Sequence, residues 1–377
     1  MAHGGTDERS WVEVDLARIR ANAAALVRVA APARLMAVVK ADGYGHGAVP
    51  VARAALAGGA SALAVATLTE GEALRQAGID APILVFAPAR PDLARRYVAH
   101  RLLATVVDWD QAQALAQAAR ELGAELTVHV KVDTGMGRLG FLPEEALARW
   151  EALAALEGLT LEGLYTHLAT ADEAETAYVR LQWERFQGLI DHLDARGLRP
   201  PVVHGANSAA LLRLPETRLD LVRAGLALYG ILPPNVPPRT RLQPALTWKC
   251  RITAVRTLPA GWGISYGIEH VTWRPTRVAT LAVGYADGYR RALSGRAQVL
   301  IQGHRCPVLG RVTMDQVMVD ITDLEEDPGQ EAILLGGSGP LAIDAWELAR
   351  WMGTIPYEVF TGISPRVERR YLGELDG

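Results

Sequence analysis

Lys40 is the residue of this sequence whose type and position indicate chemistry most clearly. It follows a short apolar run, residues 35–39, and opens a loop with three glycines, Gly43, Gly45 and Gly47. A lysine at the end of a buried strand is desolvated, which lowers its pKa and leaves part of it neutral, as a lysine that forms a Schiff base requires. Glycines allow positive φ and close backbone approach, so N–H groups of the loop could face a phosphate. On spacing alone, a strand that ends in a tight turn with a solvated lysine explains the pattern too.

Other polar residues directly follow further apolar runs. They are Lys131, Asp133, His167, His204, Asn207, Ser208 and Arg223. Each has an ordinary explanation on its own, for example Ser208 as the N-cap of the helix expected after it. Because a helix N-terminus also attracts anions, both interpretations of Ser208 can hold. Several such residues after successive strands favour an active site, since the carboxyl ends of barrel strands meet at one face.

The order of the expected elements predicts a barrel. Apolar, β-branched-rich runs occur at residues 36–39, 62–66, 83–86, 103–107, 126–132, 159–165, 202–203 and 219–222. Between most of them lie alanine- and leucine-rich stretches with helical spacing, for example residues 15–30, 49–57, 109–122 and 177–196. Eight strands alternating with helices are typical of an α/β protein with a (β/α)8 TIM barrel. A doubly wound open sheet is the structural alternative.

The pattern changes after Gly230. Residues 232–241 (LPPNVPPRTR) are proline-rich and indicate a linker. Short alternating runs follow at residues 245–255, 278–283, 298–301, 306–309, 316–321 and 331–335, with one helical stretch at 343–352. We therefore place the barrel domain at residues 1–240 and a mostly β C-terminal domain at 241–377. The strand-like residues 11–14 (WVEV) precede the first barrel helix and could pair with the second domain.

The composition limits the classes of function. Of the 377 residues, 50% are hydrophobic and 21% are charged, which supports a sizeable core and argues against disorder. A net charge of −3 with scattered arginines disfavours nucleic-acid binding. Cys250 and Cys306 lack metal-ligand spacing, so no metal site is expected. No apolar run is long enough to span a membrane and residues 1–10 lack a secretory signal, so a cytoplasmic protein is expected.

The segment AVVKADGYGHG, residues 37–47, resembles the pyridoxal phosphate motif of bacterial alanine racemases, with Lys40 as the cofactor lysine. Similar segments follow in order along the chain: VHVKVDTGMGRLGF, LYTHLATAD, HGANSAA, DLVRAGLALYG, GWGISYGIEH, VGYADGY and VTMDQVMVD. The resemblance implies a homodimer whose active site is shared across the interface. It also implies interconversion of L- and D-alanine, with D-alanine supplied for peptidoglycan.

The resemblance assigns residues to each part of the cofactor. Those near the phosphate are Tyr44, Ser208, Tyr357 and the backbone of Gly225 and Leu226, and Asn207 is a further cofactor-binding residue. Arg223 would face the pyridine nitrogen, and His167 would pack beside the ring and join the arginine network. Because an arginine stays protonated, Arg223 would leave the ring nitrogen unprotonated, which weakens the electron sink and disfavours side reactions. A salt bridge at a strand end explains Arg223 without the resemblance.

The substrate contacts implied by the resemblance come from both domains. Arg138 would bind the substrate carboxylate and the phenolic oxygen of the cofactor, and Met314, Asp315 and Tyr285 would line the site from the second domain. Lys131 would be carbamylated, an N6-carboxylysine whose carboxylate orients Arg138. Without the modification, Lys131 and Arg138 would be two like charges in a partly buried site, which is unfavourable.

Racemisation needs proton transfer on both faces of the α-carbon, so Lys40 requires a second base. Tyr266 in GWGISYGIEH is the candidate, and in the family this tyrosine reaches the cofactor across a head-to-tail dimer interface. A free tyrosine has a pKa near 10 and needs nearby positive charge to act as a base. Without the resemblance, Tyr266 is simply a strand residue before a glycine turn.

Two departures from the family and three alternative functions stay open. Thr313 and Thr361 stand where many relatives carry other residues, which bears on pocket width and inhibitor sensitivity. A serine or broad-specificity racemase would differ only in its pocket. A related decarboxylase would need an acidic residue in place of Arg223 and a Cys-Asp pair, which neither cysteine of this chain forms. A non-catalytic cofactor-binding protein would lack the second domain and Tyr266.

Overall fold

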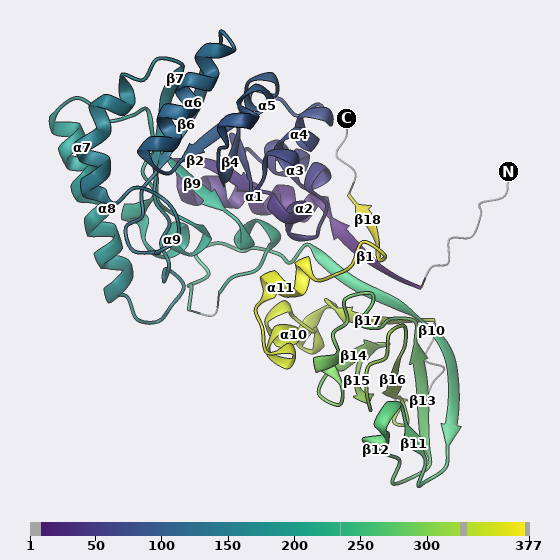
Figure 1. Ribbon diagram of the computed structural model, residues 1–377. Coiled ribbons are helices and arrows are strands. Elements are labelled where there is room, and N and C mark those ends of the chain that lie inside the picture. The colour runs from purple at the N-terminus through teal and green to yellow at the C-terminus, as the bar shows by residue number, and fades with distance from the viewer. Residues whose placement is uncertain (1–8, 234, 325–329, 374–377) are drawn as a thin grey trace. The chain divides into compact units, whose positions relative to one another are not determined.

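The computed structural model describes residues 9–233, 235–324 and 330–373, and these form two units (Figure 1). The barrel unit contains residues 17–43 and 48–243. The β unit contains the described residues up to 16, residues 44–47 and the residues from 244 onwards. Residues 1–8, most of the stretch searched for a secretory signal, lie outside the described residues.

The barrel unit is built on one parallel sheet, so the predicted (β/α)8 fold class is confirmed. Its strands are β2 (Arg34–Val38), β3 (Ala62–Val65), β4 (Ile83–Pro88), β5 (Leu103–Val106), β6 (Leu126–Lys131), β7 (Leu159–Tyr165), β8 (Val202–His204) and β9 (Leu221–Ala224). They pair in the order β8-β7-β6-β5-β4-β3-β2-β9. At the two ends of that order, the backbone N–H groups of Asp220 and Arg223 donate to Val203 and Ala206, which nearly closes the barrel.

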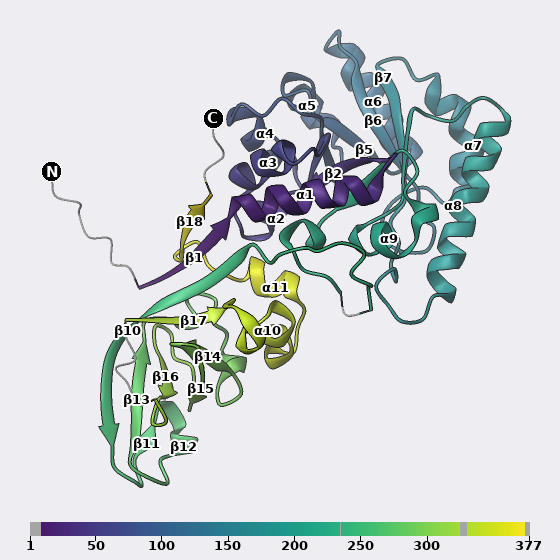
Figure 2. The same ribbon diagram turned by 180° about the vertical axis from the view of Figure 1, so that it is seen from behind.

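Helices cover the outside of this sheet (Figures 1 and 2). They are α1 (Leu16–Ala30), α3 (Ala48–Ala57), α4 (Leu68–Gln76), α5 (Ala94–Ala99), α6 (Trp109–Glu121), α7 (Pro143–Ala154), α8 (Ala177–Ala195) and α9 (Ser208–Arg213). The side chains of Leu63, Leu84 and Val130 on the strands are completely buried. This packing of small and branched apolar residues is the principal source of stability in such a barrel.

The β unit is mostly β, as predicted. Its strands are β1 (Ser10–Asp15), β10 (Leu246–Leu258), β13 (Thr276–Leu281), β14 (Gln298–Ile301), β15 (His304–Leu309), β16 (Val317–Asp320), β17 (Glu331–Leu335) and β18 (Glu368–Leu372). They form one sheet in the order β13-β16-β15-β14-β17-β10-β1-β18, and β10 pairs with β13 as well. The strand-like residues near the N-terminus lie in β1, which pairs with β10 and β18.

Smaller elements complete the β unit. A two-stranded ribbon joins β11 (Gly263–Ile264) to β12 (His270–Val271), with a 3-10 turn at Tyr266–Ile268 between them. Helices α10 (Ala345–Met352) and α11 (Pro356–Thr361) follow β17. None of the helices in the described ranges has both the length and the apolar character needed to cross a membrane.

Candidate active site

The barrel unit brings several of the predicted site residues together at the carboxyl ends of its strands. Lys40 follows β2, Lys131 ends β6, His167 follows β7, and Arg223 lies in β9. The pKa of His167 is lowered to about 3, first by burial and then by the positive charges of Arg223, Arg138, Lys131 and Lys40. Charges that act on one imidazole must lie close to it, so these five groups form one cluster. Its net positive charge suits an anionic ligand.

Lys40 is partly desolvated at the end of its strand. Burial is the main cause that lowers the pKa of Lys40, the positive charge of Arg138 lowers it further, and Glu70 raises it. A lowered pKa increases the neutral fraction of the amine at physiological pH. The chemistry expected of this residue from the sequence is therefore favoured by its surroundings.

A left-handed turn holds the chain directly after Lys40. The short helical element α2 (Lys40–Tyr44) has positive φ at Ala41 (52°), Asp42 (52°), Gly43 (60°) and Tyr44 (53°). Non-glycine residues pay roughly 1–2 kcal/mol each in this region. Two carboxylates hold the turn, because Glu70 Oε1 accepts from Ala41 N at 2.7 Å and Asp42 Oδ1 accepts from Ala48 N at 2.8 Å.

Glu70 is a residue that sequence reasoning missed. Its other carboxylate oxygen, Oε2, accepts from Ala66 N and Thr67 N, and the Thr67 side chain accepts from Glu70 N at the start of α4. This is a capping box, and the Thr-x-x-Glu spacing at residues 67–70 is the signal that could have revealed it. The Glu70 side chain therefore connects the N-terminus of α4 to the turn that follows Lys40.

Arg223 is held in a fixed orientation inside the barrel. Its Nη1 donates to His204 Nδ1 at 2.8 Å and to His204 O at 3.2 Å. Its Nη2 donates to Thr166 O at 2.8 Å and Gly205 O at 3.0 Å, with His167 Nδ1 at 3.4 Å. Within the described ranges its Nε–H has no hydrogen-bond partner, although Arg223 is only 3% exposed. A donor left without a partner on an otherwise buried side chain suits a ligand atom that accepts a hydrogen bond.

The loop after β6 carries Lys131 and Arg138. Lys131 Nζ donates to Leu139 O at 2.8 Å. Burial lowers the pKa of Lys131 to about 8, Asp133 raises it, and Arg138 and Arg223 lower it further. The Asp133 carboxylate accepts from the backbone N–H groups of residues 135, 136 and 138, so it organises this loop. Arg138 itself is exposed.

The residues assigned to the phosphate fall into two groups. In the barrel unit, Ser208 Oγ accepts from Gly225 N at 2.9 Å and Ala227 N at 3.3 Å, which places Ser208 beside Gly225 and Leu226. The N-cap of α9 is Asn207, whose side chain accepts from Ala210 N, so the expectation that Ser208 caps this helix was wrong. In the β unit, the rings of Tyr44 and Tyr357 lie 5.8 Å apart between centroids.

Tyr266 and Tyr285 share a cavity of about 570 Å³ in the β unit. Its other lining residues are Arg291, Arg311, Val312 and Thr313. Tyr266 is 72% exposed, and the same stretch of chain carries further exposed apolar side chains: Trp262, Ile268, Val271 and Trp273. Many exposed large apolar side chains in one segment are typical of an interaction surface.

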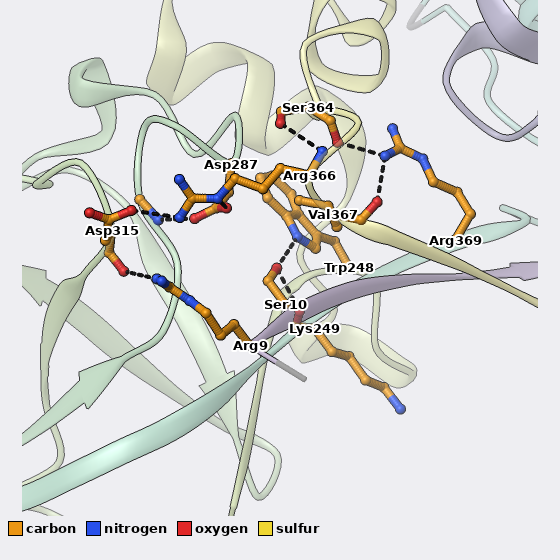
Figure 3. A network of polar contacts seen from close by, with 11 residues as sticks. Arg9, Ser10, Trp248, Lys249, Asp287, Asp315, Ser364, Arg366, Val367 and Arg369 are labelled. Atoms are coloured by element: carbon orange, nitrogen blue, oxygen red, sulfur yellow. Dashed lines mark hydrogen bonds and ion pairs between the residues drawn. The ribbon is translucent and has the colours of Figure 1, made fainter. Parts of the chain in front are cut away.

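The loop that carries Met314 and Asp315 is clamped by arginines (Figure 3). Arg366 Nε lies 2.9 Å from Asp287 Oδ1, and its Nη2 lies 2.5 Å from Asp315 Oδ1. Arg9 Nη2 donates to Asp315 O at 2.8 Å. Met314 is exposed beside this clamp, so its backbone is fixed while its side chain faces solvent. Within the described ranges no group of His, Cys, Asp and Glu residues could hold a metal ion.

Gly284→Ala is expected to disturb this loop without unfolding the chain. A Cβ at residue 284 would lie 2.3 Å from Met314 O and 2.4 Å from Thr313 O, so the loop must move. If Met314 contacts substrate, we expect KM to rise about tenfold, since a small displacement costs about 1.4 kcal/mol of binding. Steady-state kinetics and the melting temperature of the variant test this. An unchanged KM would show that the loop does not contribute to binding.

Comparisons with known proteins agree with this fold and site. The family "alanine racemase, N-terminal domain" matches residues 14–233, and the family "alanine racemase, C-terminal domain" matches residues 245–371. Alanine racemase of Symbiobacterium thermophilum is 51% identical over 97% of each chain. That of Desulforamulus reducens is 46% identical over 97% of this chain and 100% of its own.

Solved structures agree as well. The crystal structure of alanine racemase from E. faecalis superposes with a TM-score of 0.92 at 37% identity, over 98% of this chain and 99% of that one. The alanine racemase from Bartonella henselae, solved with covalently bound pyridoxal phosphate, superposes with a TM-score of 0.87 at 27% identity over 97% and 99%. Sequence and structure together show that the chain belongs to the alanine racemase family.

Proposed function

We propose that this alanine racemase binds pyridoxal 5′-phosphate and uses two bases, Lys40 and Tyr266, to interconvert L- and D-alanine. The D-alanine would supply peptidoglycan synthesis. The observation that carries the proposal is the presence of a partly desolvated Lys40 and a firmly hydrogen-bonded Arg223 in the same cationic cluster. The cytoplasmic location expected from the sequence stays a prediction.

The residues of the cluster fit this cofactor. Arg223 offers an Nε–H that lacks a partner in the described part of the chain, and a pyridine nitrogen is a matching acceptor. Burial lowers the pKa of Arg223 only to about 10, so it remains a donor at neutral pH. Ser208 and the backbone of Gly225 and Leu226 in the barrel unit would contact the phosphate, and Asn207 would contact the cofactor.

Tyr44 and Tyr357 of the β unit would contact the phosphate as well. Tyr44 is almost fully buried, and burial together with the neighbouring Tyr357 raises its pKa. Its phenol therefore stays protonated and can donate a hydrogen bond to a phosphate oxygen.

Each remaining residue has a defined task. When bound, the cofactor withdraws electrons from the α-carbon of alanine and so makes its α-proton more acidic. Lys40 Nζ would hold or return this proton on one face, and Tyr266 Oη would do so on the other. Arg138 would bind the alanine carboxylate. Tyr285, Met314 and Asp315 would border the substrate.

His167 would be a neutral neighbour of the ring. Because its pKa is about 3, the imidazole of His167 is neutral at neutral pH, and its Nδ1 can accept a hydrogen bond from Arg223. A neutral imidazole adds no positive charge to the cluster, which already contains two arginines and two lysines. This limits the charge repulsion that the cluster must tolerate.

The active form would be a homodimer in which Tyr266 acts at the Lys40 of the partner copy. The exposure of Tyr266 and of Trp273, which is 80% exposed, supports a surface that a second copy covers. Dimers with two-fold symmetry, in which both subunits use the same surface, are the commonest oligomers of soluble proteins.

Mixing two inactive variants tests this arrangement directly. In a dimer of Lys40→Ala with Tyr266→Phe, one site contains both substitutions and the other site is intact. Random subunit exchange at equal concentrations should therefore restore about a quarter of wild-type racemisation, because half of the dimers are mixed and each has one intact site. If Tyr266 served the site of its own chain, mixing would restore nothing.

Lys131 would carry a carbamate, formed when its neutral amine reacts with bicarbonate and releases water. Below pH 8 the amine is mostly protonated and cannot react, and above pH 8 it is mostly neutral. At fixed total bicarbonate we expect the carbamate to increase with pH up to about 8 and then level off. An unperturbed lysine would not level off until about pH 10.4.

Carbon-13 NMR with labelled bicarbonate measures this directly. Lys131→Met is the control, because it should lose the carbamate signal at every pH. A signal that persists in that variant, or none in the wild type, would contradict the assignment of Lys131.

A further inference from the structure

Four side chains from four neighbouring strands form one hydrogen-bonded row across the barrel interior. Arg223 Nη1 on β9 lies 2.8 Å from His204 Nδ1 on β8. His204 Nε2 lies 2.9 Å from His129 Nδ1 on β6, and His129 Nε2 lies 3.3 Å from Glu162 Oε2 on β7. Arg223, His204 and His129 are buried, whereas the Glu162 side chain is 38% exposed.

The protons in this row can have only one arrangement. An arginine only donates hydrogen bonds, so His204 Nδ1 must accept and the proton of His204 lies on Nε2. That proton is donated to His129 Nδ1, so the proton of His129 lies on Nε2 and points at Glu162. An ionised carboxylate only accepts, so the far end of the row requires the same direction. A second proton on either ring would place two donors face to face.

The electrostatics of the two ends agree with this arrangement. Burial and the charge of Arg223 lower the pKa of His204 well below its ordinary value, so that ring is neutral. The hydrogen bond from His129 lowers the pKa of Glu162, so its carboxylate is ionised at neutral pH. The row therefore begins at a buried cation and ends at an anion.

Neighbouring residues make room for the row and hold it. Gly163 is paired with His129 between β7 and β6, and a Cβ at residue 163 would lie 2.4 Å from His129 Nδ1. Glycine weakens a strand interior, so its presence here indicates a close approach that a side chain would block. On the other ring, Tyr165 stacks on His204 with centroids 4.8 Å apart and planes 7° apart.

We propose that Glu162 and His129 are positioning residues for Arg223. They fix His204 as a hydrogen-bond acceptor, which holds the guanidinium by Nη1 and keeps Nε–H free for a ligand. Glu162 also balances the buried positive charge through the two rings. This inference rests on the proposed function, in which Arg223 donates to the ring nitrogen of the cofactor. It gives a role in the reaction to a partly exposed carboxylate that touches neither cofactor nor substrate.

Histidine-labelled protein tests the row without the cofactor. Nitrogen-15 NMR of the full-length chain reports which ring nitrogen carries the proton. In the wild type we expect the proton of both His204 and His129 on Nε2. Glu162→Gln should shift the ring nitrogens of both histidines. The matched control is Glu125→Gln. The Glu125 carboxylate accepts from Thr160, which lies on β7 like Glu162, but Glu125 is not part of the row. This substitution should shift the ring nitrogens of neither histidine.

Kinetics test the consequence for catalysis. We expect Glu162→Gln to lower kcat about three- to tenfold, because it weakens the hydrogen bond from His129 to a charged carboxylate. KM should change less than about twofold, because Glu162 does not touch the substrate. Glu125→Gln should leave both constants unchanged. In the Arg223→Lys variant the effect of Glu162→Gln on kcat should vanish, because Glu162 acts through Arg223 and the effects of two coupled substitutions do not add.

Several results would overturn the inference. They are a proton on His204 Nδ1 in the wild type, ring signals that do not respond to Glu162→Gln, and fully additive effects of the two substitutions. A wild-type chain that fails to bind pyridoxal phosphate or to racemise alanine would instead contradict the proposed function. The NMR result would still decide whether the row exists.

Discussion

Lys40→Ala is expected to abolish racemisation, with a loss of at least about a thousandfold. The substitution removes both the amine that would bond the cofactor and one of the two bases, and a positioned general base alone contributes about 10²–10⁴. The cofactor should no longer be retained covalently, so the purified protein should also lose its visible absorbance. Optical rotation of an L-alanine solution and the absorbance spectrum measure the two effects.

Lys249→Ala is the matched control for this substitution. Lys249 lies on β10, where its Nζ is 2.8 Å from Glu13 Oε1 in a partly buried ion pair. Its removal should leave racemisation unchanged, because Lys249 is not among the residues assigned to the site. If Lys40→Ala kept substantial activity or retained a covalently bound cofactor, the assignment of Lys40 and the residues around it would be wrong.

Tyr266→Phe is expected to have the second largest effect, a loss of about 10²–10⁴ in racemisation. Because L- and D-alanine have equal free energies, kcat/KM must fall by the same factor in both directions. The asymmetry of a two-base mechanism should instead be visible in isotope exchange. With only Lys40 left, one enantiomer should still exchange its α-proton with deuterated water without inversion, and the other should not.

Tyr285→Phe is the comparison for this experiment, because both tyrosines line the same cavity. If Tyr285 contacts substrate without acting as a base, exchange and racemisation should decline together. Equal exchange of both enantiomers in Tyr266→Phe would rule out a base that serves one face only.

Much of the fold could be predicted from the sequence because each barrel element is long enough to show its period. The expected helix at 177–196 is α8 (Ala177–Ala195), and the expected strands at 298–301 and 331–335 coincide with β14 and β17. The two-residue strands β11 and β12 have no detectable alternation. Helix α11 has only six residues, too few for an apolar face to repeat.

The site was less accessible to sequence reasoning. The glycines of the lysine loop do take positive φ, but so do Asp42, which tolerates the left-handed region, and Ala41 and Tyr44, whose local propensity does not favour it. Their conformation depends on an acceptor from α4, which is a tertiary contact. His129 and Glu162 were missed for a similar reason. They lie 33 residues apart on consecutive strands and meet only through the pairing of β6 with β7.

The left-handed turn also determines when, during synthesis, Lys40 acquires its final geometry. The acceptor for Ala41 N is Glu70, 29 residues further along the chain, at the start of α4. This contact cannot form until β3 and the beginning of α4 have left the ribosome and folded onto β2. A nascent chain that ends before residue 70 therefore lacks one of the two carboxylates that hold the turn. If the cofactor bonds Lys40, its capture would be complete only after the first two β–α units have folded.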